Sequence, residues 1–590
     1  MKKVLFWLLP LAVAAAGCNK MEIISTPTDD TSSTSPSTDT SSGEEGKETY
    51  EDSDFGRTVT ITWTDAGAQV SGDVNSIATV SGGHVTVDNT GTTEKVKYIL
   101  SGTSADGSLK LYSNNKQMLS LEGLSLSNPT GAAINNQGHK SCYVAVSGTN
   151  TLSDGSSAAY TTVKNAAGEE EDQKAVFFSE GQLLFSGDGN LTVTAANAQG
   201  KGGITSDDYI HIEGPAIRVT AGSSAGHGLR GKESVIMNAG TLDVAVTAAM
   251  KKGIASDSLV VFNGGTTTVK VTGGTAYDDE DQEYKASAGV KADQVFKMND
   301  GTLTVTNSGQ GGKGITGDAV AYFNGGTVSV TVTGSNYGSS SSGGWPGGGG
   351  GNTSSDNSKS AKGIKFDGDI HFAGSQVSVT AASHEAVEAK GTLEVTDGVL
   401  YAQSSDDAIN SAKDMTLSGG FVCAYSTGND GLDANGNCYI KGGVVYAIGA
   451  RSPEVGVDAN TEGGYKLYLT GGTLIAIGGL ENGSSLSQSC YSTSTWSANT
   501  WYALTVGNTT VAFKTPASGG SGLVVSGASQ PSLSSGVTVS NGTQIWNGMG
   551  VADGSVSGGQ TVSLSAYSGG NAGGGGGGHG GGGGRPGGGW

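Results

Sequence analysis

The sequence Lys-Gly-Ile-Ala-Ser-Asp at residues 252–257 decides the fold, because it returns as Lys-Gly-Ile-Thr-Gly-Asp at 313–318 and as Lys-Gly-Ile-Lys-Phe-Asp at 362–367. Each copy belongs to a longer unit whose second strand begins at a glycine, and these strand starts recur at spacings of roughly 22 to 25 residues. Their apolar residues alternate with period two, which indicates strands rather than helices. Such units bury their apolar faces only by stacking. The sequence therefore predicts an all-β protein, a right-handed parallel β-helix.

Composition agrees with short strands joined by tight turns. The chain has 101 Gly but only 10 Pro in 590 residues, and glycine supplies the positive φ angles that tight turns require. The net charge of −21 makes nucleic acid and anionic membrane surfaces poor partners and cations good ones. We expect a monomer that binds no nucleic acid.

The chain divides into five segments. Lys2 and Lys3, an apolar run over 4–16 and then Gly-Cys predict a lipoprotein signal peptide at 1–18, with Cys18 as the lipidated residue; an ordinary secretory signal is the alternative. Residues 19–57 are too polar to order and predict a disordered tether. The β-helix is expected over 58–483, with loop insertions near 273–287 and 335–360, followed by a β-rich capping region at 484–568 and a glycine-rich tail at 569–590. This organisation predicts a bacterial protein on the outer membrane or cell surface, touching the membrane only through the lipid at Cys18.

The remaining cysteines are Cys142, Cys423, Cys438 and Cys490. Their spacing fits no zinc motif, and Cys423 is expected to point outward while Cys438 points inward. Free, buried or half-buried thiols are therefore expected.

The first position of the repeated six-residue sequence turns from Lys to acidic residues in later units. Equivalent residues of stacked coils lie about 4.8 Å apart. Glu385, Asp407 and Asp430 are therefore expected to form one column, and Glu388, Asn410, Asp433 and Asp458 a second. Like charges at that spacing repel by roughly 3 kcal/mol at an effective dielectric constant of 20. Calcium, which takes six to eight oxygen ligands, would remove this repulsion, and we expect more than one ion. Turn-shaping hydrogen bonds are the alternative. The candidate calcium ligands are Glu385, Glu388, Asp406, Asp407, Asn410, Asp430, Asp433, Asn435 and Asp458.

The earlier units carry both charges. Lys252, Lys313 and Lys362 are expected to alternate with the aspartates five residues on, as a ladder of ion pairs on a solvated face, with Arg230 extending the region. An acidic polysaccharide could contact Arg230 and Lys390 beside the calcium ions.

Aromatic residues occupy outward strand positions in the acidic units, namely Tyr401, Phe421 and Tyr446. An exposed apolar row needs a partner. Either a sugar ring stacks on it, or the chain after about residue 484, which contains Trp496 and Trp501, folds back over it.

From about residue 58 to 480 the chain resembles a family of β-helical carbohydrate-binding lipoproteins, the DUF4353 family of a clostridial cellulose- and polyacid-binding protein. Ile99-Leu-Ser-Gly-Thr-Ser-Ala-Asp-Gly, Gly187-Asp-Gly-Asn-Leu-Thr-Val and above all Gly226-His-Gly-Leu-Arg-Gly-Lys-Glu-Ser-Val carry the resemblance. It implies a right-handed β-helix related in shape to pectate lyases, several calcium ions, and non-catalytic binding of plant cell-wall polysaccharides.

The sequence thus predicts a non-catalytic, calcium-binding surface lipoprotein that binds acidic glycans such as pectate or polygalacturonate, with cellulose as a further candidate. A calcium-dependent pectate lyase is the alternative, with Lys390 as its general base. A structural or adhesive rod is the second alternative.

Overall fold

The computed structural model describes residues 54–73, 75–155, 159–165, 168–196, 200–338 and 358–569. These residues belong to one compact unit, Tyr50–Trp590. The predicted signal peptide with Cys18, most of the tether, part of the second loop insertion and all of the tail beyond residue 569 lie outside the described residues.

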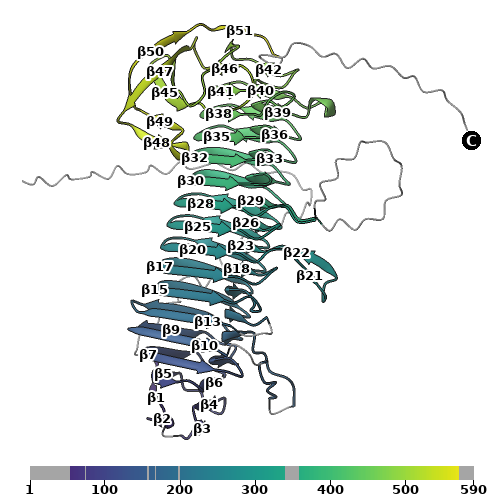
Figure 1. Ribbon diagram of the computed structural model, residues 1–590. Helices are drawn as coiled ribbons and strands as arrows, with labels where there is room; N and C mark the ends of the chain where they lie inside the picture. The colour runs from purple at the N-terminus through teal and green to yellow at the C-terminus, as the bar shows by residue number, and fades with distance from the viewer. Residues whose placement is uncertain are drawn as a thin grey trace, which may run out of the picture. The chain divides into compact units, whose positions relative to one another are not determined.

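The described chain is a parallel β-helix, as predicted, in which each coil contributes one strand to each of three faces (Figure 1). We call the 15-stranded sheet the first face. Its strands are β3 (Ala78–Ser81), β4 (His84–Asn89), β6 (Ser108–Ser113), β8 (Ile134–Asn136), β11 (Ala175–Ser179), β14 (Gly202–Ser206), β16 (Leu229–Gly231), β18 (Lys252–Ser256), β23 (Ala288–Ala292), β26 (Lys313–Gly317), β29 (Lys362–Phe366), β31 (Val387–Ala389), β33 (Ile409–Ser411), β36 (Leu432–Ala434) and β39 (Val457–Ala459).

The other two faces share a 28-stranded sheet, because several strands run continuously around the corner between them. The corner-turning strands are β5 (Val96–Ser104), β7 (Gln117–Asn128), β15 (Tyr209–Ala221), β17 (Ser234–Val246), β30 (Ile370–Ala381) and β32 (Leu393–Ser404). The second face also has β9 (Cys142–Ser147), β12 (Leu183–Gly187), β19 (Leu259–Phe262), β24 (Val295–Met298), β27 (Val320–Phe323), β34 (Met415–Leu417), β37 (Cys438–Ile440), β40 (Leu467–Leu469) and β42 (Ser485–Leu486). The third face also has β10 (Thr149–Asp154), β13 (Asn190–Ala195), β20 (Thr266–Val271), β25 (Thr302–Asn307), β28 (Thr327–Val332), β35 (Phe421–Ser426), β38 (Val444–Ile448) and β41 (Thr473–Ile477).

Alternating side chains from all three faces fill one continuous core inside the coils. The glycine of the repeated six-residue sequence allows the faces to approach. A Cβ atom on Gly314 would lie 2.2 Å from Val330 Cγ1 and 2.5 Å from the carbonyl oxygen of Gly363. A Cβ atom on Gly253 would likewise clash with Val269, and one on Gly363 would clash with Val379. The recurrence of this glycine therefore follows from the space that the third face leaves.

A ladder of asparagines joins consecutive coils at the turn between the second and third faces. Asn263 donates to Asn238 at 2.9 Å, Asn299 donates to Asn263 at 2.8 Å, and Asn324 donates to Asn299 at 2.8 Å. Asn263 and Asn299 each use both the donor and the acceptor of their amide, so the ladder fixes the turn and the coil register together.

Antiparallel strands close both ends of the stack. At the first coil, β1 (Arg57–Thr64) pairs with β2 (Gly67–Ser71), and β3 pairs with β4. At the last coil, β41 pairs with β46 (Leu523–Ser526), which continues to β43 (Cys490–Thr493) and β51 (Ser565–Tyr567). The described residues contain no α-helix, only 3₁₀ turns such as Thr461–Gly463 and Trp546–Gly548.

The C-terminal region forms a six-stranded antiparallel sheet beside the third face of the last coils (Figure 1). Its strands, in spatial order, are β48 (Thr543–Ile545), β49 (Gly550–Ala552), β45 (Thr509–Lys514), β44 (Trp501–Val506), β47 (Ser532–Ser540) and β50 (Ser555–Val562). A second apolar core lies between this sheet and the β-helix.

The first predicted loop insertion is a hairpin rather than an unstructured loop. Strands β21 (Ala276–Asp278) and β22 (Glu283–Lys285) pair antiparallel and project beside the first face (Figure 1).

All four described cysteines are free and buried, as expected. Cys438 lies in the core inside the coils, whereas Cys423 lies in the second core, under the C-terminal sheet. The expected orientations of these two thiols are therefore confirmed.

Candidate functional site

Two columns of charged residues run along the first face. In the first column Lys313 pairs with Lys362, and the next coils place Glu385, Asp407 and Asp430 at the same offset from paired strand residues. In the second column, β-pairing links consecutive coils through Lys365, Glu388, Asn410, Asp433 and Asp458. The predicted register is confirmed, and each column changes from basic to acidic between β29 and β31.

Where the columns change sign, cations from the protein neutralise the glutamates. Lys362 Nζ lies 3.1 Å from Glu385 Oε2 and 2.5 Å from Glu388 Oε2, and Lys390 pairs with the other oxygen of Glu388. Although burial raises the pKa of Glu385, the hydrogen bond from His384 and the charge of Lys362 lower it to about 2. Glu385 and Glu388 therefore have charge partners without a metal ion.

Two predicted ligands lie beside the columns rather than in them. Asp406 Oδ2 lies 3.1 Å from His384 Nδ1, and its Oδ1 accepts from Asn429 at 3.0 Å. Asn435 is exposed and donates to the carbonyl oxygen of Ser411 at 3.4 Å. His384, Glu385 and Asp406 nevertheless bring their potential ligand atoms within 4.8 Å of one another.

Further along, the columns contain carboxylates without a cationic partner in the part of the chain that the structure describes. We call these carboxylates, together with the amide of Asn410, the acidic cluster: Asp407, Asn410, Asp430, Asp433, Asp458 and Glu481. Asn410 Nδ2 donates to Asp433 Oδ2 at 2.5 Å, and Asp407 Oδ1 accepts from the backbone N–H of Asp430 at 3.1 Å. Asp433 also contacts Asp407, and Asp458 contacts Glu481, through side-chain hydrogen bonds. Two carboxylates in contact must share a proton or a cation.

Burial and mutual repulsion raise the pKa values of this cluster. Burial raises the pKa of Asp430 to about 8, with Asp458 and Glu454 adding to the shift against the backbone hydrogen bond from Val455. Burial also raises the pKa of Asp407 and of Asp433, reinforced by Asp433 and Asp458 respectively. The cluster is thus a site at which negative charge lacks compensation.

The acidic cluster fits a hard divalent cation. Its donors are all oxygens, and one is an amide, as calcium prefers. Carboxylates of neighbouring coils touch in two pairs, Asp407 with Asp433 and Asp458 with Glu481, so each pair could contribute ligands to one ion. Magnesium is a poorer match because it dehydrates reluctantly and takes few protein ligands.

The raised pKa of Asp430 predicts how stability depends on pH when metal is chelated. A carboxyl group whose folded pKa lies above its unfolded value of about 3.9 stabilises the fold below that value and loses this contribution as the pH rises through about 8. In EDTA we expect the melting temperature to fall by several degrees between pH 5 and pH 9, and to fall less in Asp430→Asn. Thermal denaturation monitored by circular dichroism tests this, and a melting temperature that rises toward pH 9 would contradict it.

Sequence reasoning missed Glu481. It follows the last coil, and an isolated bridge between Val457 and Leu480 brings it beside Asp458. Burial raises its pKa to about 7, together with the contact to Asp458. It follows the glycine-led strand β41 (Thr473–Ile477) by four residues, so continuing the column by one coil past Asp458 could have pointed to it.

The aromatic row predicted to bind sugar is covered, which corrects that assignment. Tyr446 is fully buried, donates to the carbonyl oxygen of Lys514 at 3.1 Å and packs on Phe513 and Trp546. Tyr401 is also buried, and Phe421 packs against the same core. These side chains point outward as expected, but the C-terminal sheet is their partner.

The expected ion-pair ladder takes a different form. The aspartates of the repeated sequence pair with basic residues of the second column: Asp257 with Arg230 at 2.7 Å, Asp318 with Lys291 at 3.3 Å, and Asp367 with Lys365. Lys252 and Lys313 of the first column take part in none of these pairs. Arg230 is therefore engaged by Asp257.

An uncovered aromatic pair lies on the second face, in the coils that contain Asp433 and Asp458. Tyr439 and Tyr468 are directly paired in register and stack with centroids 5.1 Å apart, and Lys441 Nζ lies 4.9 Å from the Tyr439 ring centroid. Both rings are half-buried. The sequence could have identified them, because each stands at the middle, outward position of its strand.

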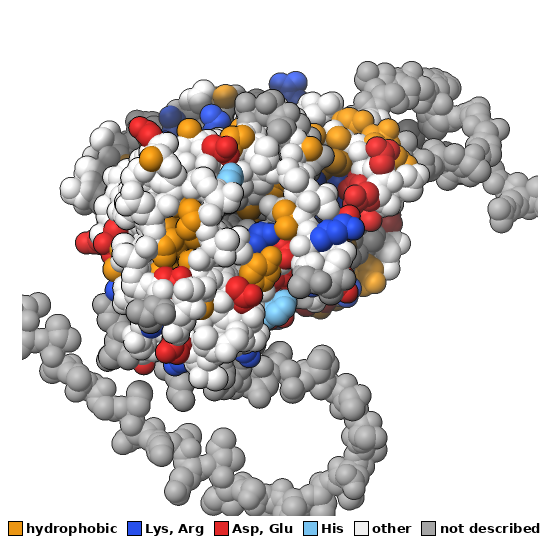
Figure 2. Space-filling view, turned by 90° about the horizontal axis from the view of Figure 1, so that it is seen from below, with side chains coloured by type: hydrophobic (Ala, Val, Ile, Leu, Met, Phe, Trp, Pro, Cys, Tyr) orange, Lys and Arg blue, Asp and Glu red, His pale blue; other side chains and the backbone are white. Residues whose placement is uncertain are grey.

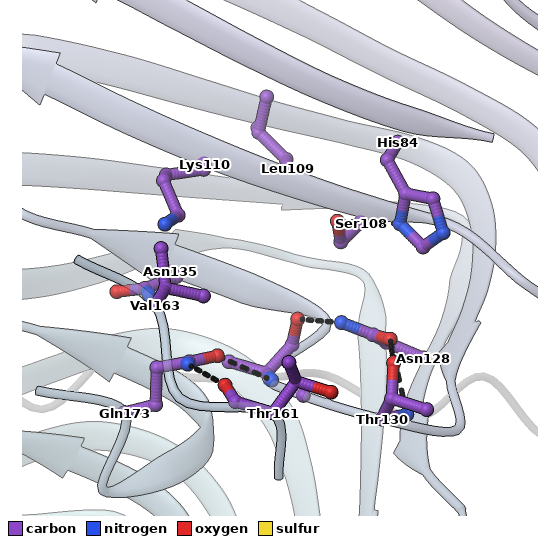
Figure 3. Close-up of a pocket in the computed structure, with 12 residues that line it drawn as sticks. His84, Ser108, Leu109, Lys110, Asn128, Thr130, Asn135, Thr161, Val163 and Gln173 are labelled. Carbon is purple, nitrogen blue, oxygen red and sulfur yellow. Dashed lines mark hydrogen bonds between the residues drawn. The ribbon is translucent and has the colours of Figure 1, made fainter. Parts of the chain in front are cut away.

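A pocket between the first coils is lined mainly by polar side chains, several of which are already hydrogen-bonded within the protein, whereas Asn135 Nδ2 has no partner in the described chain (Figure 3). It encloses about 160 Å³, which is small for a sugar. Asn128 donates to Ala132 at 2.7 Å, and Gln173 donates to Thr161 at 3.0 Å. Figure 2, which views the molecule from the end where β1 to β4 lie, shows positive and negative side chains interspersed. Neither feature defines a binding site.

The geometry defines a parallel β-helix with charged columns on one face. A family model described as carbohydrate-binding domain-containing protein matches residues 81–258, 244–336 and 309–408, which together span more than half of the chain. The chain belongs to this carbohydrate-binding domain family.

Comparison with curated proteins finds no match. Among solved structures the chain is similar to a polysaccharide lyase-like protein from C. thermocellum, determined as a gadolinium derivative. The identity is 22%, the match covers 44% of this chain and 94% of that chain, and the TM-score is 0.35. No helix among the described residues is long and apolar enough to span a membrane.

Proposed function

We propose that this protein is a non-catalytic, calcium-dependent binder of acidic polysaccharides such as pectate or polygalacturonate. Membership of a carbohydrate-binding family supports the polysaccharide as partner. The acidic cluster supports the proposal of calcium and an acidic polysaccharide, because its carboxylates lack cationic partners among the described residues and contact one another. A calcium ion there would supply positive charge and open coordination positions to a uronate carboxylate.

The proposed site uses two adjoining faces of the same coils. Asp433, Asp458 and Glu481 would hold the cation on the first face, while Tyr439 and Tyr468 present ring faces on the adjoining second face. Aromatic rings provide rigid apolar surface for the C–H face of a sugar. A neutral glycan such as cellulose would use the tyrosines alone.

The alternative, a pectate lyase with Lys390 as general base, has less support. A base in such a reaction needs a lowered pKa. Burial opposes charge on Lys390, but the hydrogen bond to Glu388 and the surrounding carboxylates raise its pKa. This lysine is therefore suited to an ion pair rather than to proton abstraction. A purely structural or adhesive rod remains the second alternative.

We further propose that the protein is a monomeric lipoprotein of the DUF4353 type, anchored through Cys18 at the outer membrane or cell surface of a bacterium. The composition of residues 1–18 supports the anchor. Metabolic labelling with a radioactive fatty acid in the wild type and in Cys18→Ala tests it.

Affinity electrophoresis through gels containing polygalacturonate tests the proposed function. We expect strong retardation in calcium that EDTA reduces severalfold, and a similar reduction in an Asp433→Asn, Asp458→Asn double variant in calcium. Unsaturated uronates, the ultraviolet-absorbing products of a lyase, should not accumulate. Retardation that is indifferent to EDTA, or accumulation of unsaturated product, would overturn the proposal.

A further inference from the structure

A cleft of about 640 Å³ lies between the first face and the β21–β22 hairpin. Strands β18, β23 and β26 form its floor, and the hairpin inserted between β20 and β23 contributes Glu283, Tyr284 and Lys285. Its volume is in the range of small-molecule sites. The cleft lies on earlier coils than the acidic cluster and shares no residue with it.

Most charged groups in this cleft are paired with one another. Arg230 binds Asp257 through two hydrogen bonds of 2.9 and 2.7 Å. Lys291 lies 2.5 Å from Asp293 and 3.3 Å from Asp318. On the hairpin, Lys285 lies 2.9 Å from Asp278. The groups in these pairs carry three positive and four negative charges, so any positive charge of the cleft comes from the lysines that remain.

Lys252 and Lys313 line the cleft and form no ion pair with a carboxylate in the described chain. Ala288 lies between them in the first column, paired with Lys252 on one side and with Lys313 on the other. Neighbouring strands are about 4.8 Å apart, so these two lysine backbones are about 10 Å apart with a small side chain between them. The Ala288 side chain therefore leaves room for a guest between the ammonium groups.

Lys252 Nζ donates to the backbone carbonyl oxygen of Met250 at 2.7 Å, which leaves its positive charge without a carboxylate partner among the described residues. Burial lowers the pKa of Lys252 to about 8, helped by Lys291, Lys251 and Lys285, and burial lowers that of Lys313 to about 8, helped by Lys365 and Lys362. His227, the preceding residue of the column, accepts a hydrogen bond from the Lys252 backbone at 2.9 Å. Burial and the charge of Lys252 lower the pKa of His227, so its ring contributes no charge to the cleft.

Aromatic rings border the cleft on the hairpin side. Tyr284, which lines it, lies 5.1 Å from Tyr277 and 5.4 Å from Tyr337 between ring centroids. Tyr277 is 41% exposed although it is a large apolar residue. A cationic floor beside an aromatic wall suits a ligand that has both an anionic group and an apolar ring face.

We propose that this cleft binds a uronic acid unit of an acidic glycan, with its carboxylate between Lys252 and Lys313 and its ring against Tyr284. The proposal rests on the carbohydrate-binding function proposed above, and it adds a second site that needs no metal. A carboxylate held by two ammonium groups forms charge-assisted hydrogen bonds. One glycan chain lying along the first face could then contact lysines in this cleft and metal-bridged carboxylates in later coils.

Isothermal titration calorimetry of the full chain with trigalacturonic acid in EDTA tests this site. We expect saturable binding that weakens at least tenfold in a Lys252→Met, Lys313→Met double variant. Lys270→Met, which removes an exposed lysine of the third face, serves as matched control and should bind as the wild type does. The trimethyl ester of the same trisaccharide should not bind. Tyr284→Ala, on the projecting hairpin, should weaken binding about fivefold without affecting the fold even if the lysine variant is unstable.

Absence of binding to the wild type in EDTA would overturn the cleft site, and so would unchanged affinity in both the lysine and the tyrosine variants. Equal binding of the ester would also overturn it. Failure of the proposed function is distinguishable, because that function predicts calcium-dependent retardation by polygalacturonate that depends on Asp433 and Asp458. The cleft variants should retain that retardation in calcium.

Discussion

Replacing Trp546 with alanine will lower the free energy of unfolding by about 3–5 kcal/mol. The Trp546 side chain is 1% exposed, and its ring lies 5.7 Å from Tyr446 and 6.5 Å from Phe421 between centroids. Its removal leaves a cavity in the second core, between the C-terminal sheet and the third face, that rigid sheets cannot fill. Chemical denaturation gives the change in stability, and binding of an apolar dye reports the exposure of Tyr446.

Trp501→Ala is the matched control. Trp501 begins β44 in the same sheet, is half-buried and lies outside the second core, so its replacement should cost less than about 1 kcal/mol. An equal loss of stability in both variants would show that Trp546 does not stabilise the packing of the C-terminal sheet on the β-helix.

Calcium will raise the melting temperature by about 2–3 °C when it is present at about one hundred times its dissociation constant, because a unit of this size has a large entropy of unfolding. An ion that binds only the folded protein stabilises it by about 2.7 kcal/mol at that concentration. In this chain it would also relieve the repulsion among Asp407, Asp433 and Asp458, whose pKa values are raised. Differential scanning fluorimetry with calcium and with EDTA measures the shift.

The Asp433→Asn, Asp458→Asn variant should lose most of this shift and melt higher than the wild type in EDTA, because it carries less buried charge. An Asp300→Asn, Asp397→Asn variant removes the same charge from exposed turns, where each carboxylate accepts from the following glycine at 2.7 Å. It should keep the full calcium shift. A shift that survives in the first variant would place the cation elsewhere, for example beside His384, Glu385 and Asp406.

The register of the charged columns could be predicted because parallel coils of regular length place equivalent residues side by side. Glu388, Asn410, Asp433 and Asp458 pair as the repeat indicated. Their charge partners could not be predicted in the same way. Salt bridges depend on side-chain reach across coils, so Asp257 meets Arg230 of the preceding coil rather than Lys252 of its own.

The partner of the aromatic row could not be predicted from the sequence, for a different reason. The outward-pointing side chains of Tyr401 and Tyr446 are equally consistent with a sugar-binding face and with an interface to another part of the chain. The alternation within a strand reports which side a residue occupies, but not what lies on that side. Only the position of the antiparallel strands beyond residue 500 decides between them, and that is a long-range contact.

The antiparallel strands at the two ends of the stack have a consequence for assembly. A parallel stack of coils presents unpaired N–H and C=O groups at each end, and another copy could extend the ladder through them. Here β2 and β3 occupy the first end, and β46 pairs with β41 at the last. Because these strands run against the direction of the coils, a further coil finds no template to continue, so head-to-tail growth into fibrils is disfavoured.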